Sequence, residues 1–207
     1  MKPSHALGLA LRDFYANSWR LLPFNAALGA VLVLAGVAAF AARGAIIVVL
    51  LAGPLLAALV HCAVLVARTG NLAFSDGVDG LRLHWRRGFA LGACGSVLLS
   101  VGTVAIHVYG RTPLWPLAFV TVYALVVLGI YQLVLWTLAI AEPSVPLRAT
   151  ARAAAQFVAL RPWPTLALGL ALLAINVAGA AAALMPFLTL TVAYSFLAAA
   201  HFVLEEH

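Results

Sequence analysis

The stretch Gly88–Ala141 decides the fold of this chain. It reads GFALGACGSVLLSVGTVAIHVYG over Gly88–Gly110, then Arg111-Thr112, then PLWPLAFVTVYALVVLGIYQLVLWTLAIA over Pro113–Ala141. Each apolar run exceeds the length of about 20 residues at which a helix crosses the hydrocarbon of a bilayer. The runs are continuously apolar rather than alternating, and a helix satisfies its own backbone polar groups inside lipid. The stretch therefore predicts two membrane-spanning helices joined by a short turn.

The rest of the chain has the same character. Hydrophobic residues make up 65% of it and charged residues only 9%, and its mean hydropathy is +1.09, too apolar for a water-soluble core of this size. The other apolar runs are Leu21–Ala42, Ala45–Ala67, Trp163–Met185 and Pro186–Leu204. We expect an all-α polytopic membrane helical bundle, a single membrane domain over residues 1–207, with six transmembrane helices in three hairpins. Leu184-Met185-Pro186 favours a tight hairpin between the last two spans, and a long bent helix is the alternative.

Positive charge is distributed unevenly between the two sides of this layout. One side carries Lys2, Arg12, Arg20, Arg68, Arg82, Arg86, Arg87, Arg148, Arg152 and Arg161. The other side carries only Arg43 and Arg111. Because short basic loops stay in the cytoplasm, the bias predicts that both termini are cytoplasmic. The basic residues behind the net charge of +6 then orient the chain in the membrane and contact the lipid bilayer. We expect no nucleic acid partner.

Three polar segments precede the three expected hairpins, at about residues 5–20, 75–87 and 145–161. In the second segment Val78, Leu81 and Trp85 follow one helical stripe, while arginines line another. Such segments are typical of amphipathic helices on the cytoplasmic surface. Their recurrence fits an internal repeat, or the chance self-similarity of an Ala/Leu/Gly-rich chain. The candidate docking residues on this surface are Arg82, Arg86, Arg87, Arg148 and Arg152.

A few polar side chains fall inside the expected spans: His61, Tyr131, Gln132, Asn176 and His201. Polar groups are costly in lipid, so we expect these side chains to form hydrogen bonds between helices or to line a polar path. The glycines and serines at 88, 92, 96 and 100, four residues apart, favour a close-packing face of a helix.

Enzyme activity is not indicated, and we expect no catalytic residue, cofactor or metal. Lys2 is the only lysine, which excludes a Walker-type phosphate loop and a lysine Schiff base within the fold. Cys62 and Cys94 lack the companion ligands of a zinc site. Ser96 and His201 could form a serine–histidine pair, but the surrounding sequence lacks the Gly-x-Ser-Gly turn of intramembrane proteases.

Three stretches of this sequence resemble the YesL-like family of bacterial integral membrane proteins. They are the junction Asp76–Phe89, the segment Arg152–Pro162 leading into a span, and Leu11–Tyr15 followed by Asn25. The resemblance implies a six-helix protein of the bacterial cytoplasmic (inner) membrane, without transferable catalytic residues and often linked to carbohydrate uptake. ABC importer subunits are the partners that it implies.

Two functions are consistent with these observations. The first is a non-catalytic integral membrane protein, an accessory or partner of a membrane complex, which docks through its basic cytoplasmic helices. The alternative is a small-solute, sugar-like transporter or channel. The alternative requires a continuous polar cavity that reaches His61, Gln132 or Asn176.

Overall fold

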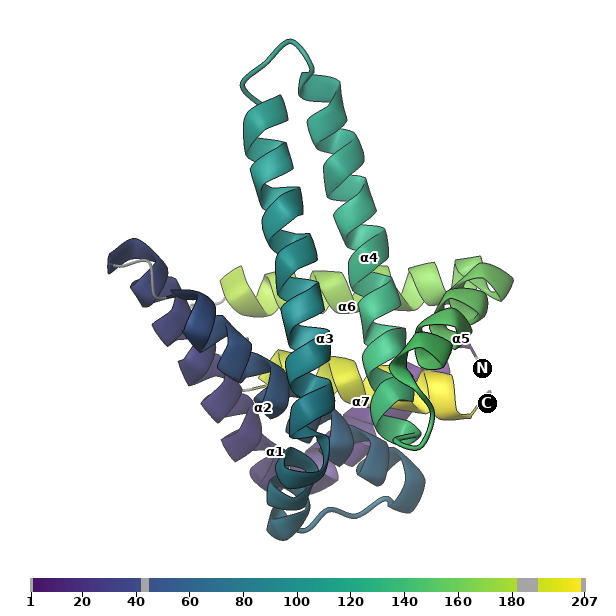
Figure 1. The fold of residues 1–207 in the computed structure, drawn as a ribbon. Coiled ribbons are helices and arrows are strands. Elements are labelled where there is room, and N and C mark those ends of the chain that lie inside the picture. Colours follow the sequence, from purple (N-terminus) through teal and green to yellow (C-terminus); the bar gives the residue numbers. More distant parts are fainter. Residues whose placement is uncertain (1, 42–44, 182–189, 206–207) are drawn as a thin grey trace.

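The structure is a computed structural model that describes residues 2–41, 45–181 and 190–205. Its regular structure in these ranges is helical, which confirms the all-α prediction. The seven helices are α1 (Pro3–Ala41), α2 (Ala45–Thr69), α3 (Phe74–Tyr109), α4 (Trp115–Ala141), α5 (Leu147–Leu160), α6 (Pro162–Ala181) and α7 (Val192–Leu204) (Figure 1).

Four helices in the described ranges are long and apolar enough to cross a membrane. They are Ala52–Thr69 within α2, all of α3, all of α4 and Pro162–Gly179 within α6. By helix length and hydropathy the chain is a multi-pass membrane protein. The expected first and last spans are not among these four, and the described part of α7 is shorter than a span. The expected hairpin at Leu184-Met185-Pro186 lies outside the described residues.

Two boundaries expected between a surface helix and a span are not helix ends. Residues 5–20 and 21–42 were expected as separate elements, but α1 runs through them to Ala41. Likewise α3 runs through Arg87-Gly88 to Tyr109 as 36 residues, about 54 Å of helix at 1.5 Å per residue. Neither junction has a residue that must end a helix, and Pro23 lies inside α1. Helix α1 changes direction along its course (Figure 1), and proline is a common cause of such bends.

The core is centred on α7. Every residue from Ser195 to Val203 is buried, and α7 packs against α1, α2 and α4. A helix that is hydrophobic all round is buried, and α7 is apolar apart from Tyr194, Ser195 and His201. The C-terminal helix is therefore an interior element of the described fold.

Helices α2 and α3 approach closely because glycines meet between them. A Cβ added to Gly88 would lie 2.7 Å from Cβ of Ala57, and one added to Gly92 would lie 2.8 Å from Cα of Gly53. No real side chain fits at such distances, so the close-packing interpretation is confirmed for Gly88 and Gly92. Beyond α2, Gly70 at φ 74° takes the left-handed conformation that follows many helix ends.

Helices α3 and α4 form an arm that projects beyond the other helices (Figure 1). The two helices meet at Gly102, where an added Cβ would lie 2.6 Å from Cδ2 of Leu125. Many large apolar side chains of the arm are exposed, among them Val97, Val101, Val104, Phe119 and Tyr123. In the same view α6 and α7 run across the direction of the arm (Figure 1). The described helices therefore do not form one compact bundle of parallel hairpins.

Candidate functional site: polar groups between the helices and a basic surface

Of the five polar residues expected inside the spans, four lie at separate contacts between helices and Gln132 lies at a pocket. His61 on α2 faces His84 on α3, with Nδ1 of His61 and Nε2 of His84 3.2 Å apart. His84 is only 1% exposed, and its Nδ1 has no hydrogen-bond partner among the described residues. Gly80 makes room for the pair, because a Cβ there would lie 2.9 Å from Cβ of His61. The two imidazoles therefore form a half-buried polar contact between α2 and α3.

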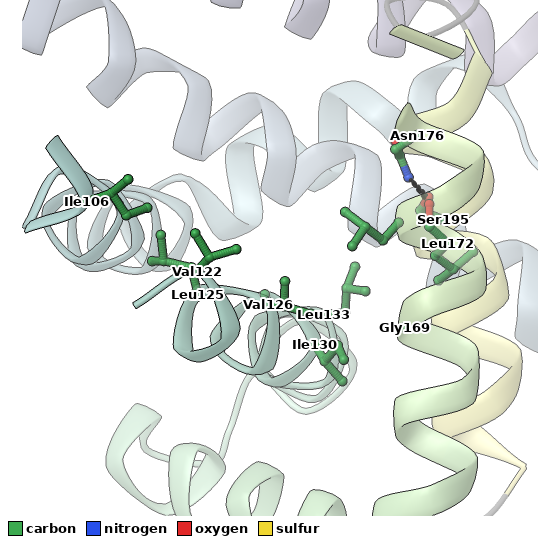
Figure 2. Close-up of a pocket in the computed structure, with 12 residues that line it drawn as sticks. Ile106, Val122, Leu125, Val126, Ile130, Leu133, Gly169, Leu172, Asn176 and Ser195 are labelled. Carbon is green, nitrogen blue, oxygen red and sulfur yellow. Dashed lines mark hydrogen bonds between the residues drawn. The ribbon is translucent and has the colours of Figure 1, made fainter. Parts of the chain in front are cut away.

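Asn176 on α6 is hydrogen-bonded within the protein. Its Nδ2 donates to Oγ of Ser195 on α7 at 2.7 Å and to the carbonyl of Leu172 at 2.8 Å. Figure 2 shows this bond at one end of a pocket of about 370 Å³, whose other labelled residues are apolar and come mainly from α4. The pair ties α6 to the central helix α7, and the pocket beside it is overwhelmingly apolar.

Gln132 on α4 lies at a second pocket, of about 440 Å³. The side-chain Oε1 of Gln132 is buried and has no hydrogen-bond donor among the described residues. None of the described residues lines both this pocket and the pocket beside Asn176. Neighbouring Tyr131 instead donates its hydroxyl to the carbonyl of Ala151 at 3.1 Å, which joins α4 to α5.

His201 on α7 is buried and lies against Asp13 of α1. Nε2 of His201 is 3.1 Å from Oδ2 of Asp13, an ion-pair distance without the alignment of a hydrogen bond. Nε of Arg12 donates to the other carboxylate oxygen at 3.1 Å. A polar pocket of about 260 Å³ adjoins His201, between the ends of α2, α4 and α7, and includes Arg68 and Glu142. The serine of the protease alternative is not part of this cluster: Ser96 lines the Gln132 pocket on α3.

Of the candidate docking arginines, Arg87 has a different position from the rest. Its Nη1 donates to the carbonyls of Ala139 at 2.8 Å and Glu142 at 3.3 Å, and its Nη2 donates to the carbonyl of Val145. These carbonyls lie at the C-terminal end of α4 and in the loop before α5. Arg87 therefore joins α3 to the start of α5.

The other four candidate arginines are exposed: Arg82, Arg86, Arg148 and Arg152. Two lie on α3 just before Arg87, and two lie in the first half of α5. Arg87 joins the part of α3 that bears Arg82 and Arg86 to the loop just before α5. We call the four exposed arginines together the basic surface. Arg86 also stacks over the ring of Trp85, with Cζ 5.2 Å from the ring centroid.

Three buried polar residues that sequence reasoning did not select take part in these contacts. They are Asp13, Asn17 and His84. Nδ2 of Asn17 donates to the carbonyl of Gly70 at 3.2 Å, so it ties α1 to the turn after α2. Asp13 and Asn17 lie four residues apart and therefore share a helix face with Leu21, a signal that a helical wheel of residues 5–25 contains.

The fold and these contacts define a multi-pass, all-helical membrane protein with polar groups between its helices. No family model, curated protein or solved structure matches the chain.

Proposed function

We propose that this protein is a non-catalytic integral membrane protein that acts as an accessory or partner of a membrane complex. The basic surface is the docking site in this proposal. The observation that supports it is the link made by Arg87, which joins the arginine-bearing part of α3 to the loop just before α5. A surface of four exposed guanidinium groups suits an acidic cytoplasmic surface on a partner.

The interior supports this function better than it supports transport. Asn176 and Tyr131 have hydrogen-bond partners within the protein, and His61 lies against His84. The pockets beside Asn176 and Gln132 have no lining residue in common in the described part of the chain, and both are mostly apolar. A path for a polar solute needs a continuous series of polar groups, so paired side chains favour the accessory role.

The topology belongs to the same proposal. Six spans, with both termini in the cytoplasm of a bacterium and the chain in its inner membrane, put the basic surface on the cytoplasmic side. The resemblance to YesL-like proteins adds carbohydrate uptake as the process and ABC importer subunits as the partner class.

Co-purification in mild detergent tests the docking role. A variant with Arg82, Arg86, Arg148 and Arg152 all changed to Gln keeps the length of the side chains but removes their charge. We expect a stoichiometric partner with the unchanged chain and at least a tenfold loss with the variant. Arg111→Gln is the matched control, because Arg111 is exposed in the turn of the arm, away from the basic surface. A solitary monomer under all conditions, or equal recovery with the variant, would contradict the proposal.

One observation favours the alternative of a small-solute transporter or channel. The side chain of Gln132 lines a pocket of about 440 Å³ between the candidate spans of α2, α3 and α4. Uptake of labelled sugars into proteoliposomes that contain only this chain separates the two functions. Uptake that Gln132→Leu abolishes would favour transport over the accessory role.

A further inference from the structure

The first half of α1, before Pro23, has two unlike faces. One face packs into the protein, and its residues are at most 8% exposed: Ala6, Ala10, Asp13, Asn17 and Leu21. The opposite face carries four large side chains that are 62%, 85%, 65% and 38% exposed: Leu11, Tyr15, Trp19 and Leu22. These four positions are three or four residues apart, so they form one line along the helix, which we call the α1 stripe.

The α1 stripe has the composition of a surface that meets lipid headgroups. Leu11 and Leu22 are aliphatic, and between them lie Tyr15 and Trp19. Tyrosine and tryptophan are the residues that gather where hydrocarbon meets headgroups. A helix that lies along a membrane buries such a stripe at this boundary. The chain is a multi-pass membrane protein, so its bilayer offers that boundary to α1.

The charges that α1 presents beside the stripe are positive. The side chain of Arg12 is 76% exposed, and Cζ of Arg20 lies 4.7 Å from the ring centroid of Trp19. Asp13 is the only acidic residue in the sequence of α1, and it is turned inward. Its Oδ2 lies 3.1 Å from Nε2 of buried His201. The outer face of this half-helix therefore combines aromatic groups with positive charge and complements an anionic surface.

We propose that the α1 stripe and its two flanking arginines bind anionic phospholipids. Tyr15 and Trp19 lie at the boundary between acyl chains and headgroups, and Arg12 and Arg20 contact the lipid phosphates. A zwitterionic phospholipid carries a cation next to its phosphate, so its net charge gives the arginines no advantage. Each basic residue near an anionic membrane surface raises affinity about fivefold. The four arginines of the basic surface take no part, so this inference does not depend on the accessory role.

Fluorescence quenching by brominated lipids tests the binding. A bimane group is attached to Ala16→Cys in the full chain, with Cys62→Ala and Cys94→Ala. Ala16 is exposed and lies one helical turn from both Arg12 and Arg20. The labelled protein is reconstituted in phosphatidylcholine, of which a fixed share is replaced by dibrominated phosphatidylglycerol or dibrominated phosphatidylcholine. We expect the anionic lipid to bind at least about fivefold more tightly beside the probe. Arg12→Gln combined with Arg20→Gln should bring the two lipids to equal affinity.

Arg111→Gln is the matched control, because Arg111 is an exposed arginine in the turn of the arm and not in α1. It should leave the preference for the anionic lipid unchanged. Tyr15→Ala combined with Trp19→Ala should weaken quenching by both lipids, and circular dichroism shows that each variant keeps its helices. Equal quenching by the two lipids in the unchanged chain would overturn the proposal. Absence of quenching by either lipid would also overturn it, because water, another protein or a second copy of the chain would then cover the stripe.

Discussion

The residues that set the spacing of α2 and α3 are glycines along one face of α3. Gly80, Gly88 and Gly92 contact α2, and buried His84 lies among them. The four-residue spacing of Gly88 and Gly92 was sufficient to predict close packing. The role of His84 could not be predicted in this way, because its partner His61 is 23 positions earlier and only the fold brings them together.

Replacing Gly88 with Ala should destabilise the protein. The added methyl group would meet Cβ of Ala57 at 2.7 Å and the carbonyl oxygen of Gly53 at 2.7 Å, so the helices must separate. We expect a loss of about 1–3 kcal/mol, as for other overpacked cores. The loss of stability is measured from the reaction of Cys62 with a fluorogenic thiol reagent during heating, since Cys62 is buried until the protein unfolds. Cys94 is exposed, so it is first replaced by Ser.

Gly8→Ala is the control for this substitution. No atom lies within 4 Å of a Cβ added to Gly8, and alanine is the better helix former. Its unfolding temperature should stay the same or rise. An equal fall for Gly8→Ala and Gly88→Ala would show that contact between α2 and α3 is not the cause.

At the scale of the elements, two helix ends are satisfied by side chains from other helices. Arg87 of α3 donates to carbonyls at the C-terminal end of α4. Asn25 of α1 accepts a hydrogen bond from the backbone N–H of Ala193, in the first turn of α7, at 3.1 Å. The last carbonyls and first N–H groups of a helix have no partner within it, so such contacts fix how helices meet.

Arg87→Ala should destabilise the protein more than Arg86→Ala. Loss of Arg87 removes charge-assisted hydrogen bonds to the end of α4, each worth about 1.5–3 kcal/mol, whereas Arg86 is exposed. Unfolding followed through Cys62 gives the comparison. Similar unfolding temperatures for the two variants would mean that the α3–α4–α5 junction contributes little.

Asn25→Leu should destabilise the protein by about 1–3 kcal/mol, because it leaves the N–H of Ala193 without its acceptor in a buried position. The same thermal measurement applies. Ala26→Leu is the neighbouring control, because Ala26 is exposed. If both substitutions have the same small effect, Asn25 does not anchor α7.

Some of these elements could be predicted from the sequence, and others could not. Arg87 was assigned to the surface with its neighbours because charge alone does not reveal a contact 52 residues away. The 145–161 segment was expected as a helix and contains α5, since its amphipathic period is regular. The boundaries at 20/21 and 87/88 were misplaced because a change from polar to apolar composition does not end a helix.

At the scale of the whole molecule, long apolar runs predict candidate spans well, but not how the spans are arranged. Hydropathy predicts the apolar parts of α3 and α4, yet it does not indicate that they form a projecting arm (Figure 1). The central position of α7 depends on contacts with α1, α2 and α4, all distant in sequence. The sequence of a uniformly apolar helix gives little information on which of its faces meets which neighbour. The arrangement of these helices can therefore be described only from the three-dimensional structure.

The basic surface and the turn of the arm lie on opposite sides of the membrane in the proposed topology. Arginine bias is the only basis for this orientation, and the whole functional proposal depends on it. Single cysteines in a Cys62→Ala, Cys94→Ala background test it, at Ser75 and Arg152 for the cytoplasmic side and at Thr112 for the other. All three positions lie outside the buried core.

The most direct measurement is labelling of these single cysteines in intact cells with a membrane-impermeant maleimide. The account predicts that Thr112→Cys is labelled in intact cells, whereas Ser75→Cys and Arg152→Cys are labelled only after the membrane is permeabilised. Labelling of Ser75→Cys or Arg152→Cys in intact cells would contradict it.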